Sequence, residues 1–203
     1  AYMYDGDAPL AERRAAALAL DRDLLRDLLG AEELRELLDP EVLDQVELEL
    51  QCLAPGRQAR SADELHDVLR RVGDLRRDEL EARSEAPAEM VGEMVGEWCD
   101  LLLAERRAVE LQVAGEARLI AAEDAARYRD GLGCAIPVGL PAAFTDPVER
   151  PLHDLVGRFA RTHGPFTTPE LAARLGAPPE RLAAALEQLE ADGRLVLGEF
   201  RPG

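Results

Sequence analysis

The sequence predicts a mainly α-helical protein with short β-hairpins, and three observations support this fold class. Hydrophobic residues make up 47% of the 203 residues and aromatic residues only 4%, so the core must consist largely of Leu, Val and Ala. Ala, Leu, Glu and Arg dominate the composition, as is typical of helical proteins. Apolar residues also recur at helical spacing along most of the chain and alternate only over short stretches.

Residues 1–56 are expected to form an N-terminal helical segment. Apolar residues recur at helical spacing from Pro9 to Gly30, and a second short helix is predicted over 31–39. A third helix is expected over 40–53, because a proline suits its first turn and Pro55-Gly56 follow it.

Residues 57–133 are predicted to form a first unit of three helices and a β-hairpin. Ser61 followed by Glu64 predicts a capping box at the start of its first helix. The turn signal Ala114-Gly115 lies between two alternating runs, which indicates a hairpin. The three helices are expected over 61–73, 74–84 and 87–107 and the hairpin over 108–122, and one more helix follows over 123–133.

The same order of elements begins again after a proline-rich stretch. Four prolines fall within residues 134–151, and we predict that residues 134–147 are a linker. A second unit is expected over 148–203. Its predicted helices cover 152–164, 165–176 with Thr168 as N-cap, and 177–193, and a strand follows over 194–200. Leu182, Leu186 and Leu189 are predicted to face the core, and Arg181, Ala184 and Gln188 the solvent.

Three helices followed by a hairpin is the order of a winged helix, in which the second and third helices form a helix-turn-helix. The sequence therefore predicts two tandem winged-helix modules behind the N-terminal segment. Leu195-Val196-Leu197 would be the first strand of the second wing. We expect its returning strand beyond Gly203, in a longer protein with this wing cut short. The alternative is that residues 195–200 pair with Phe166-Thr167.

Charge limits the contacts that the chain can make with nucleic acid. The net charge is −17, and all 24 basic residues are Arg. Residues 1–105 hold 27 acids and 12 arginines, or −15, whereas residues 106–203 hold 14 acids and 12 arginines, or −2. An acidic surface repels phosphate backbones. Any DNA binding is therefore expected to be weak and to depend on the C-terminal half.

Asp63-Glu64-Leu65-His66 spell D-E-x-H, the metal-and-water box of helicase ATPases. In that chemistry the carboxylates end a buried strand beside a phosphate loop, whereas here the residues follow an N-cap inside a predicted helix. No G-x-x-x-x-G-K-[ST] occurs, and without lysine none is possible. We predict no ATPase, no catalytic residues and no bound cofactor in this chain, and Glu64 is better explained as the capping-box acid.

The remaining reactive residues give no recognisable site. Cys52, Cys99 and Cys134 lie far apart, which favours reduced thiols over a disulfide framework or a zinc site. The three histidines have no metal-ligand spacing. No window is long and apolar enough for a membrane span, and the first residues do not resemble a signal peptide. We expect a cytoplasmic protein without a metal site or a membrane partner.

Four arginines are the best candidates for DNA phosphate contacts. They lie on the predicted helix-turn-helix, at the start of the second wing and on the first hairpin: Arg174, Arg181, Arg194 and Arg118. Nothing in the pattern indicates base readout. The alternative is that these arginines balance neighbouring acids, and that the modules serve as spacers or protein-docking units.

Several long stretches resemble one family. "YMYDGDAPLAERRAAALALDRDLLRDLLG", "ELRELLDPEVL", "AAEDAARYRDGLG", "PAAFTDPVE", "DLVGRFARTHGPFT" and "GEFRPG" are similar to bacterial ATP-dependent DNA helicases of the large helicase-related (Lhr) family. The resemblance implies a parent that moves 3′ to 5′ on single-stranded DNA, unwinds duplexes and takes part in DNA repair. ATP and Mg²⁺ would bind upstream of this chain.

The resemblance also implies a place for the chain within that parent. It would follow the helicase core and precede the rest of a long C-terminal region, and both would be its partners. Its function would be that of an accessory winged-helix region that positions or contacts DNA. The alternatives are a scaffold or protein-interaction module without DNA contact, and a free-standing winged-helix regulator.

Overall fold

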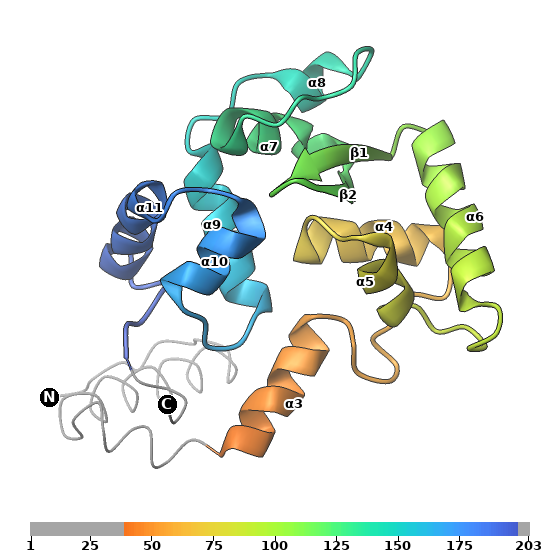
Figure 1. Cartoon of the computed structure of the whole chain (residues 1–203), viewed down its shortest axis with the longest axis horizontal. Coiled ribbons are helices and arrows are strands. Elements are labelled where there is room, and N and C mark those ends of the chain that lie inside the picture. The colour runs from red at the N-terminus through yellow and green to blue at the C-terminus, as the bar shows by residue number, and fades with distance from the viewer. Residues whose placement is uncertain (1–38, 199–203) are drawn as a thin grey trace, which may run out of the picture. The chain divides into compact units, whose positions relative to one another are not determined.

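The computed structural model describes residues 39–198, so the helices predicted over 9–38 lie outside the described residues. Within this range the chain is mostly helical with one two-stranded antiparallel sheet, as the sequence predicts (Figure 1). In chain order the elements are α3 (Pro40–Leu50), α4 (Ala62–Val72), α5 (Arg77–Ala82), α6 (Val91–Ala104), β1 (Ala108–Val113), β2 (Glu116–Ala121), η1 (Ala122–Asp124), α7 (Ala125–Leu132), α8 (Ala142–Thr145), α9 (Pro151–Thr162), α10 (Thr168–Leu175) and α11 (Pro179–Ala191).

Helix α4 begins and ends where the sequence predicts. The Ser61 hydroxyl accepts the Glu64 N–H at 3.3 Å and caps the first turn. The Glu64 carboxylate accepts the N–H of Arg60 at 2.7 Å and not that of Ser61, so only one half of the predicted capping box forms. Gly73 ends the helix with a φ of 108°. The face buried in the core is the predicted one: Leu65, Val68, Leu69 and Val72.

The hairpin β1–β2 is also confirmed. Its strands pair in register from Ala108 with Ala121 to Val113 with Glu116. Ala114 and Gly115 both have positive φ, 54° and 81°, as a two-residue primed turn requires. Leu75, between α4 and α5, exchanges two backbone hydrogen bonds with Leu119 at 3.0 and 2.8 Å. Helices α4 to α6 and this hairpin therefore give the order and pairing of a winged helix.

Helix α10 differs from the prediction at its first residue. The N-cap is Thr167, not Thr168, which is the first residue of the helix. The Thr167 hydroxyl accepts the Glu170 N–H at 3.4 Å, and the Glu170 carboxylate accepts the Thr167 N–H at 2.7 Å. Such a reciprocal pair needs a separation of three residues, and Thr168 lies only two before Glu170.

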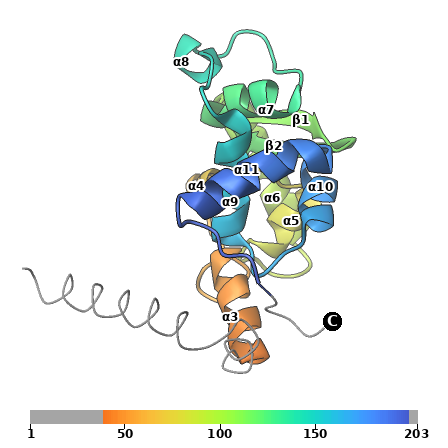
Figure 2. The same cartoon turned by 90° about the vertical axis from the view of Figure 1, so that its left-hand side faces the viewer.

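Helix α11 presents nearly the predicted face to the core. Leu182 and Leu189 are fully buried, together with Ala185. Leu186 packs against the same cluster but is only partly buried. Ala185 takes the central position in the core that we predicted for Leu186. Arg181, Ala184 and Gln188 are exposed, as predicted. Helix α11 packs on α9, as Figure 2 shows.

The predicted strand after α11 does not form over the described residues 194–198. The N–H groups of Arg194 and Leu195 both donate to the carbonyl of Leu189, at 2.9 and 3.2 Å, and close the helix end. Leu195 packs against the helices, whereas Leu197 is 83% exposed. No bridge to Phe166-Thr167 occurs within residues 39–198. A strand needs a partner for its backbone groups, and none of the described residues provides one.

Residues Glu41–Leu197 form one compact unit with three hydrophobic clusters. The first lies among α4, α5, α6 and the hairpin, and the third among α9, α10 and α11. The second covers the other side of the hairpin and contains Leu155 of α9, while the next residue, Val156, belongs to the third. Residues 134–147, predicted as a linker, pack against the second cluster through Ile136, Leu140 and Phe144.

Cys52, Cys99 and Cys134 are buried free thiols, as predicted. Burial raises the pKa of the Cys99 and Cys134 thiols, which keeps them protonated. Among residues 39–198, no helix is long and apolar enough to cross a bilayer. The same residues contain no group of His, Cys, Asp and Glu arranged to hold a metal ion.

Candidate nucleic-acid interface

The four arginines predicted to contact phosphate fall into two classes in the structure. The Arg118 side chain is 3% exposed and the Arg174 side chain 18% exposed. Arg181 and Arg194 lie on the surface. Burial and hydrogen bonding therefore decide which of the predicted residues remain accessible to a ligand.

Arg118, on β2, is held by groups from three parts of the chain. Its Nη1 lies 2.6 Å from Oδ2 of Asp74, which is itself buried. Its Nη2 lies 2.7 Å from the Glu116 carboxylate. The same guanidinium donates to the backbone carbonyl of Arg174 at 2.8 Å. Burial alone would lower the pKa of Arg118, but the hydrogen bonds to Asp74 and Glu116 outweigh it and raise the pKa.

Arg174, on α10, reaches across to the first module. Its Nη1 lies 2.7 Å from the Glu79 carboxylate of α5. Its Nη2 donates to the backbone carbonyl of Asp74 and lies 3.4 Å from the Asp74 carboxylate. Burial would raise the pKa of Glu79, but the hydrogen bond from Arg174 holds the pKa of that carboxyl below its usual range.

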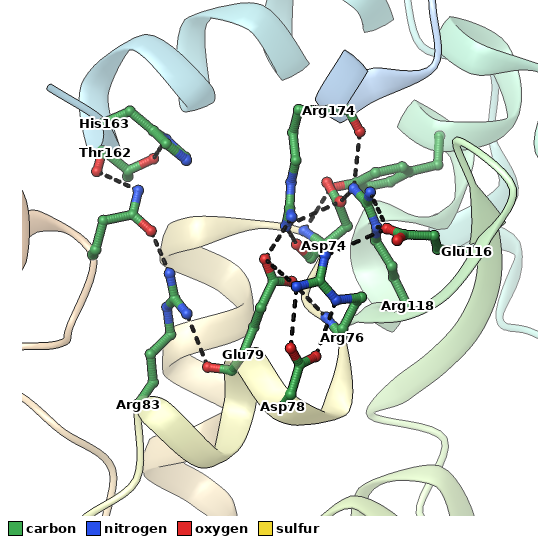
Figure 3. A network of polar contacts seen from close by, with 12 residues as sticks. Asp74, Arg76, Asp78, Glu79, Arg83, Glu116, Arg118, Thr162, His163 and Arg174 are labelled. Atoms are coloured by element: carbon green, nitrogen blue, oxygen red, sulfur yellow. Dashed lines mark hydrogen bonds and ion pairs between the residues drawn. The ribbon is translucent and has the colours of Figure 1, made fainter. Parts of the chain in front are cut away.

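These contacts form one buried polar network, drawn in Figure 3, in which Arg118 and Arg174 converge on Asp74. Tyr128 completes it, because its hydroxyl donates to the Asp74 carboxylate and accepts the Asp74 N–H, both at 2.9 Å. Burial, with Asp74 beside it, raises the pKa of Tyr128 well above its usual value. The network joins the α4–α5 turn, β2, α7 and α10.

The structure therefore gives Arg118 and Arg174 an internal role. A phosphate could reach Arg118 only if the network opened, and a charge left buried without its partner is costly. Neither side chain is exposed to a phosphate in this conformation. No local pattern reveals this pairing, because Arg118 lies 44 residues from Asp74 and 56 from Arg174.

Arg181 and Arg194 keep the accessibility that the prediction requires. Arg181, on α11, donates to the carbonyl of Gly131 at 2.8 Å. Arg194 follows α11, and its side chain lies over Gly157 of α9. A Cβ added to Gly157 would be 3.9 Å from Nη2 of Arg194. Within residues 39–198, neither guanidinium lies within 4.0 Å of a carboxylate. Both therefore remain available to a ligand anion.

The tip of the first wing packs against the second helix-turn-helix. Gly176 ends α10 with a φ of 62°, and a Cβ built on it would lie 2.7 Å from Cα of Ala114, at the hairpin turn. Real Cβ atoms essentially never approach that closely, so only glycine fits this junction. A wing contacts DNA through its exposed tip. In the described conformation Ala114, at this tip, packs against Gly176, so this side of the tip is not exposed to DNA.

The D-E-x-H residues have structural partners, as their helical position predicts. Asp63 of α4 pairs with Arg107 at 2.6 Å. Nε2 of His66 lies 3.3 Å from the Glu123 carboxylate. The Glu64 carboxylate accepts the Arg60 N–H just before the helix, and the Asp63 and His66 contacts join α4 to its neighbours. Their geometry on a helix does not resemble an ATPase site.

Comparison with known proteins agrees with this fold. Residues 36–147, more than half of the chain, match the family model described as the winged-helix domain of the large helicase-related protein. The chain belongs to this family. It is 48% identical over 200 residues to the "Lhr helicase/ probable uracil glycosylase" of Mycolicibacterium smegmatis, covering 98% of the chain. It is 42% identical over 195 residues to the "Lhr helicase/uracil glycosylase" of Escherichia coli K12, covering 96% of the chain.

The chain spans only a small part of these relatives: 13% of the M. smegmatis protein and 12% of the E. coli protein. The family resemblance predicted from the sequence is therefore confirmed, and the chain corresponds to a winged-helix region of an Lhr-family helicase. The family model ends at residue 147, before α9.

Proposed function

We propose that the chain is an accessory winged-helix region of a cytoplasmic, ATP-dependent 3′–5′ DNA helicase that acts in DNA repair. In this proposal the region contacts DNA weakly and holds it at a fixed orientation to the helicase core and the downstream C-terminal region. ATP and Mg²⁺ belong to residues outside this chain, because no phosphate loop occurs in it. The segment itself carries no catalytic activity.

The observation that carries the positioning role is the buried network around Asp74. Three guanidinium contacts shorter than 3.0 Å tie α10 to α5, α10 to β2, and β2 to the α4–α5 turn. The arginines satisfy several acceptors at once, which fixes the relative orientation of the elements as well as their contact. A winged-helix pair joined in this way keeps one orientation, which a part that guides DNA past a motor needs.

The DNA contact and the repair role rest on other support. Winged helices commonly place a helix-turn-helix against DNA, and both relatives carry names that join a helicase to a uracil glycosylase. Weak affinity follows from the net charge of −17, because few cations are free to displace phosphate counterions.

The experiment is a salt titration of DNA binding by the 203-residue chain. Fluorescent single-stranded and duplex oligonucleotides are titrated with protein from low to physiological salt. We expect binding at low salt, with a slope of log K against log [salt] that corresponds to a few phosphate contacts. The absence of binding to both DNAs at the lowest salt would contradict a DNA contact by this region.

The alternative function is a scaffold that contacts only other parts of the parent protein. It is favoured by the internal role of Arg118 and Arg174, which removes two of the four predicted contacts. The same titration separates the two functions, because a scaffold is expected to bind neither DNA. The free-standing regulator is not proposed, since the chain belongs to a helicase family.

A further inference from the structure

Some exposed arginines in the described part of the chain have no carboxylate partner and could bind a ligand anion. Acids outnumber arginines in this chain, 41 to 24, and most of the arginines among residues 39–198 lie within 4.0 Å of a carboxylate. Among these described residues, three exposed arginines close to α9 have no carboxylate within 4.0 Å. They are Arg71 at the end of α4, Arg161 on α9 and Arg194 after α11. We call these three residues the arginine stripe.

The members of the stripe are linked through Arg158 of α9. Arg71 and Arg158 line the same open cleft of about 590 Å³, whose walls come from α4, η1, α7, α8 and α9. Arg161 follows one turn later on α9, close enough to Arg158 and Arg194 for their charges to act on it. Arg194 lies over Gly157, on the same side of α9. The stripe thus runs from the first module to the end of the second.

The acids beside the stripe are already engaged. Asp124 lies 2.6 Å from both Arg127 and Arg158, and Asp154 lies 3.4 Å from Arg127. Glu123 pairs with Arg70 at 2.9 Å. The remaining acid of the cleft, Asp67, faces Arg70 at 3.6 Å. The positive charge left over belongs to the stripe.

Among residues 39–198, the charges that act most strongly on Arg161 are positive. Burial lowers the pKa of Arg161, and the cations Arg194 and Arg158 lower it further, against a smaller opposing effect of Asp154. Two guanidiniums that repel each other are stabilised when a phosphate lies between them, since it supplies the missing charge and accepts their N–H groups. In a chain of net charge −17, such a local excess of cations is an exception.

We propose that the phosphodiester backbone of DNA binds along the arginine stripe, across α9, rather than at the first wing. This inference rests on the proposed function, which requires only that the region touch DNA somewhere. Arg181, at the start of α11, lies outside the stripe. The stripe joins both winged-helix modules, so DNA bound on it would follow the rigid unit as a whole.

The test compares two double variants of the full chain with equal charge. Arg161→Gln/Arg194→Gln removes two members of the stripe. Arg57→Gln/Arg77→Gln removes two other exposed arginines, which make only surface ion pairs with Glu49 and Asp100. Because all four side chains are solvent-accessible, both variants are expected to keep the fold, and circular dichroism checks this.

The expected result is a loss specific to the stripe. In Arg161→Gln/Arg194→Gln, the negative slope of log K against log [salt] is expected to become shallower by about 1.4 for single-stranded DNA and about 1.8 for duplex. The charge-matched control is expected to keep the wild-type slope. Arg161→Lys/Arg194→Lys is expected to restore most of the lost slope, since it restores the charges. Arg71→Gln is expected to lower the slope by about 1.

Two results would overturn the inference. If the chain binds DNA and the stripe variant keeps the wild-type slope, DNA binds elsewhere, and the proposed function stands without this site. If polyglutamate binds as tightly as DNA and loses affinity in the same variant, the stripe is a site for acidic proteins. Absence of DNA binding by the wild-type chain would instead contradict the proposed function itself.

Discussion

The junction between Gly176 and Ala114 allows a sharp test of how the two modules are joined. In Gly176→Ala the new Cβ would lie 2.7 Å from Cα of Ala114 and 3.1 Å from its backbone nitrogen. Neither atom belongs to a flexible side chain, so the backbone of the hairpin tip or of the α10–α11 turn must shift. Overpacking of this kind costs about 1–3 kcal/mol.

A second contribution comes from the backbone conformation. Gly176 has a φ of 62°, and a residue with a Cβ in the left-handed region costs about 1–2 kcal/mol more than glycine. The total expected loss of unfolding free energy for Gly176→Ala is therefore about 2–5 kcal/mol. Gly193 provides the matched control. It follows α11 with a φ of 68°, but its Cβ would meet nothing within 4 Å.

The assay is urea unfolding of both variants, monitored by circular dichroism. The midpoints are compared provided that both variants show the same dependence of unfolding free energy on urea concentration. Gly193→Ala is expected to lose only the conformational cost, about 1–2 kcal/mol, and Gly176→Ala the sum of both. The difference between the variants measures the steric contact with the wing tip. Equal losses in the two variants would refute the packed junction.

Three further predictions concern the core, the network and catalysis. Leu182→Ala, at a fully buried site, is expected to lower the free energy of unfolding by about 2–5 kcal/mol in urea unfolding. Leu186→Ala, at a half-buried site, is expected to lower it clearly less. A larger loss at Leu186 would mean that α11 turns a different face to the core. Because the pKa of Glu79 is lowered in the folded state, its pairing stabilises the chain above about pH 4.3 and this stability is lost as the pH falls through the folded value. Arg174→Met is expected to reduce that acid-dependent loss, and an unchanged pH profile of unfolding would contradict the pairing. The purified chain is expected not to hydrolyse ATP with or without DNA, and turnover abolished by Glu64→Gln would disprove this.

The sequence predicts the first module well, because its signals are local. Ser61 caps α4, and Ala114-Gly115 form the hairpin turn, each through contacts within a few residues. Where two local solutions compete, the prediction is less secure: Thr167 and Thr168 both suit an N-cap, and the distance to Glu170 decides between them. Leu195-Val196-Leu197 have strand-forming side chains, but a strand also depends on a partner that local sequence does not reveal.

The candidate site is harder to predict, because its contacts are distant in sequence. The last four residues of β2 are all buried, since helices cover both sides of the hairpin. Strand alternation therefore gives no sign that Arg118 lies inside. The arginine stripe has the opposite problem: Arg71, Arg161 and Arg194 come from distant parts of the sequence and gather beside α9 only when α4 and α11 pack against it. An unpaired charge is visible only once the partners of all other charges are known.

The sharing of α9 between two hydrophobic clusters has a practical consequence for dissecting the chain. Leu155 packs with the hairpin side and Val156 with α10 and α11, so one helix completes two cores. A cut within residues 134–147 would separate Leu155 from the cluster it fills and expose apolar surface on both pieces. Half-chains made this way are expected to aggregate or bind non-specifically. DNA contacts should therefore be mapped by substitutions in the intact chain, where every comparison keeps the same folded unit.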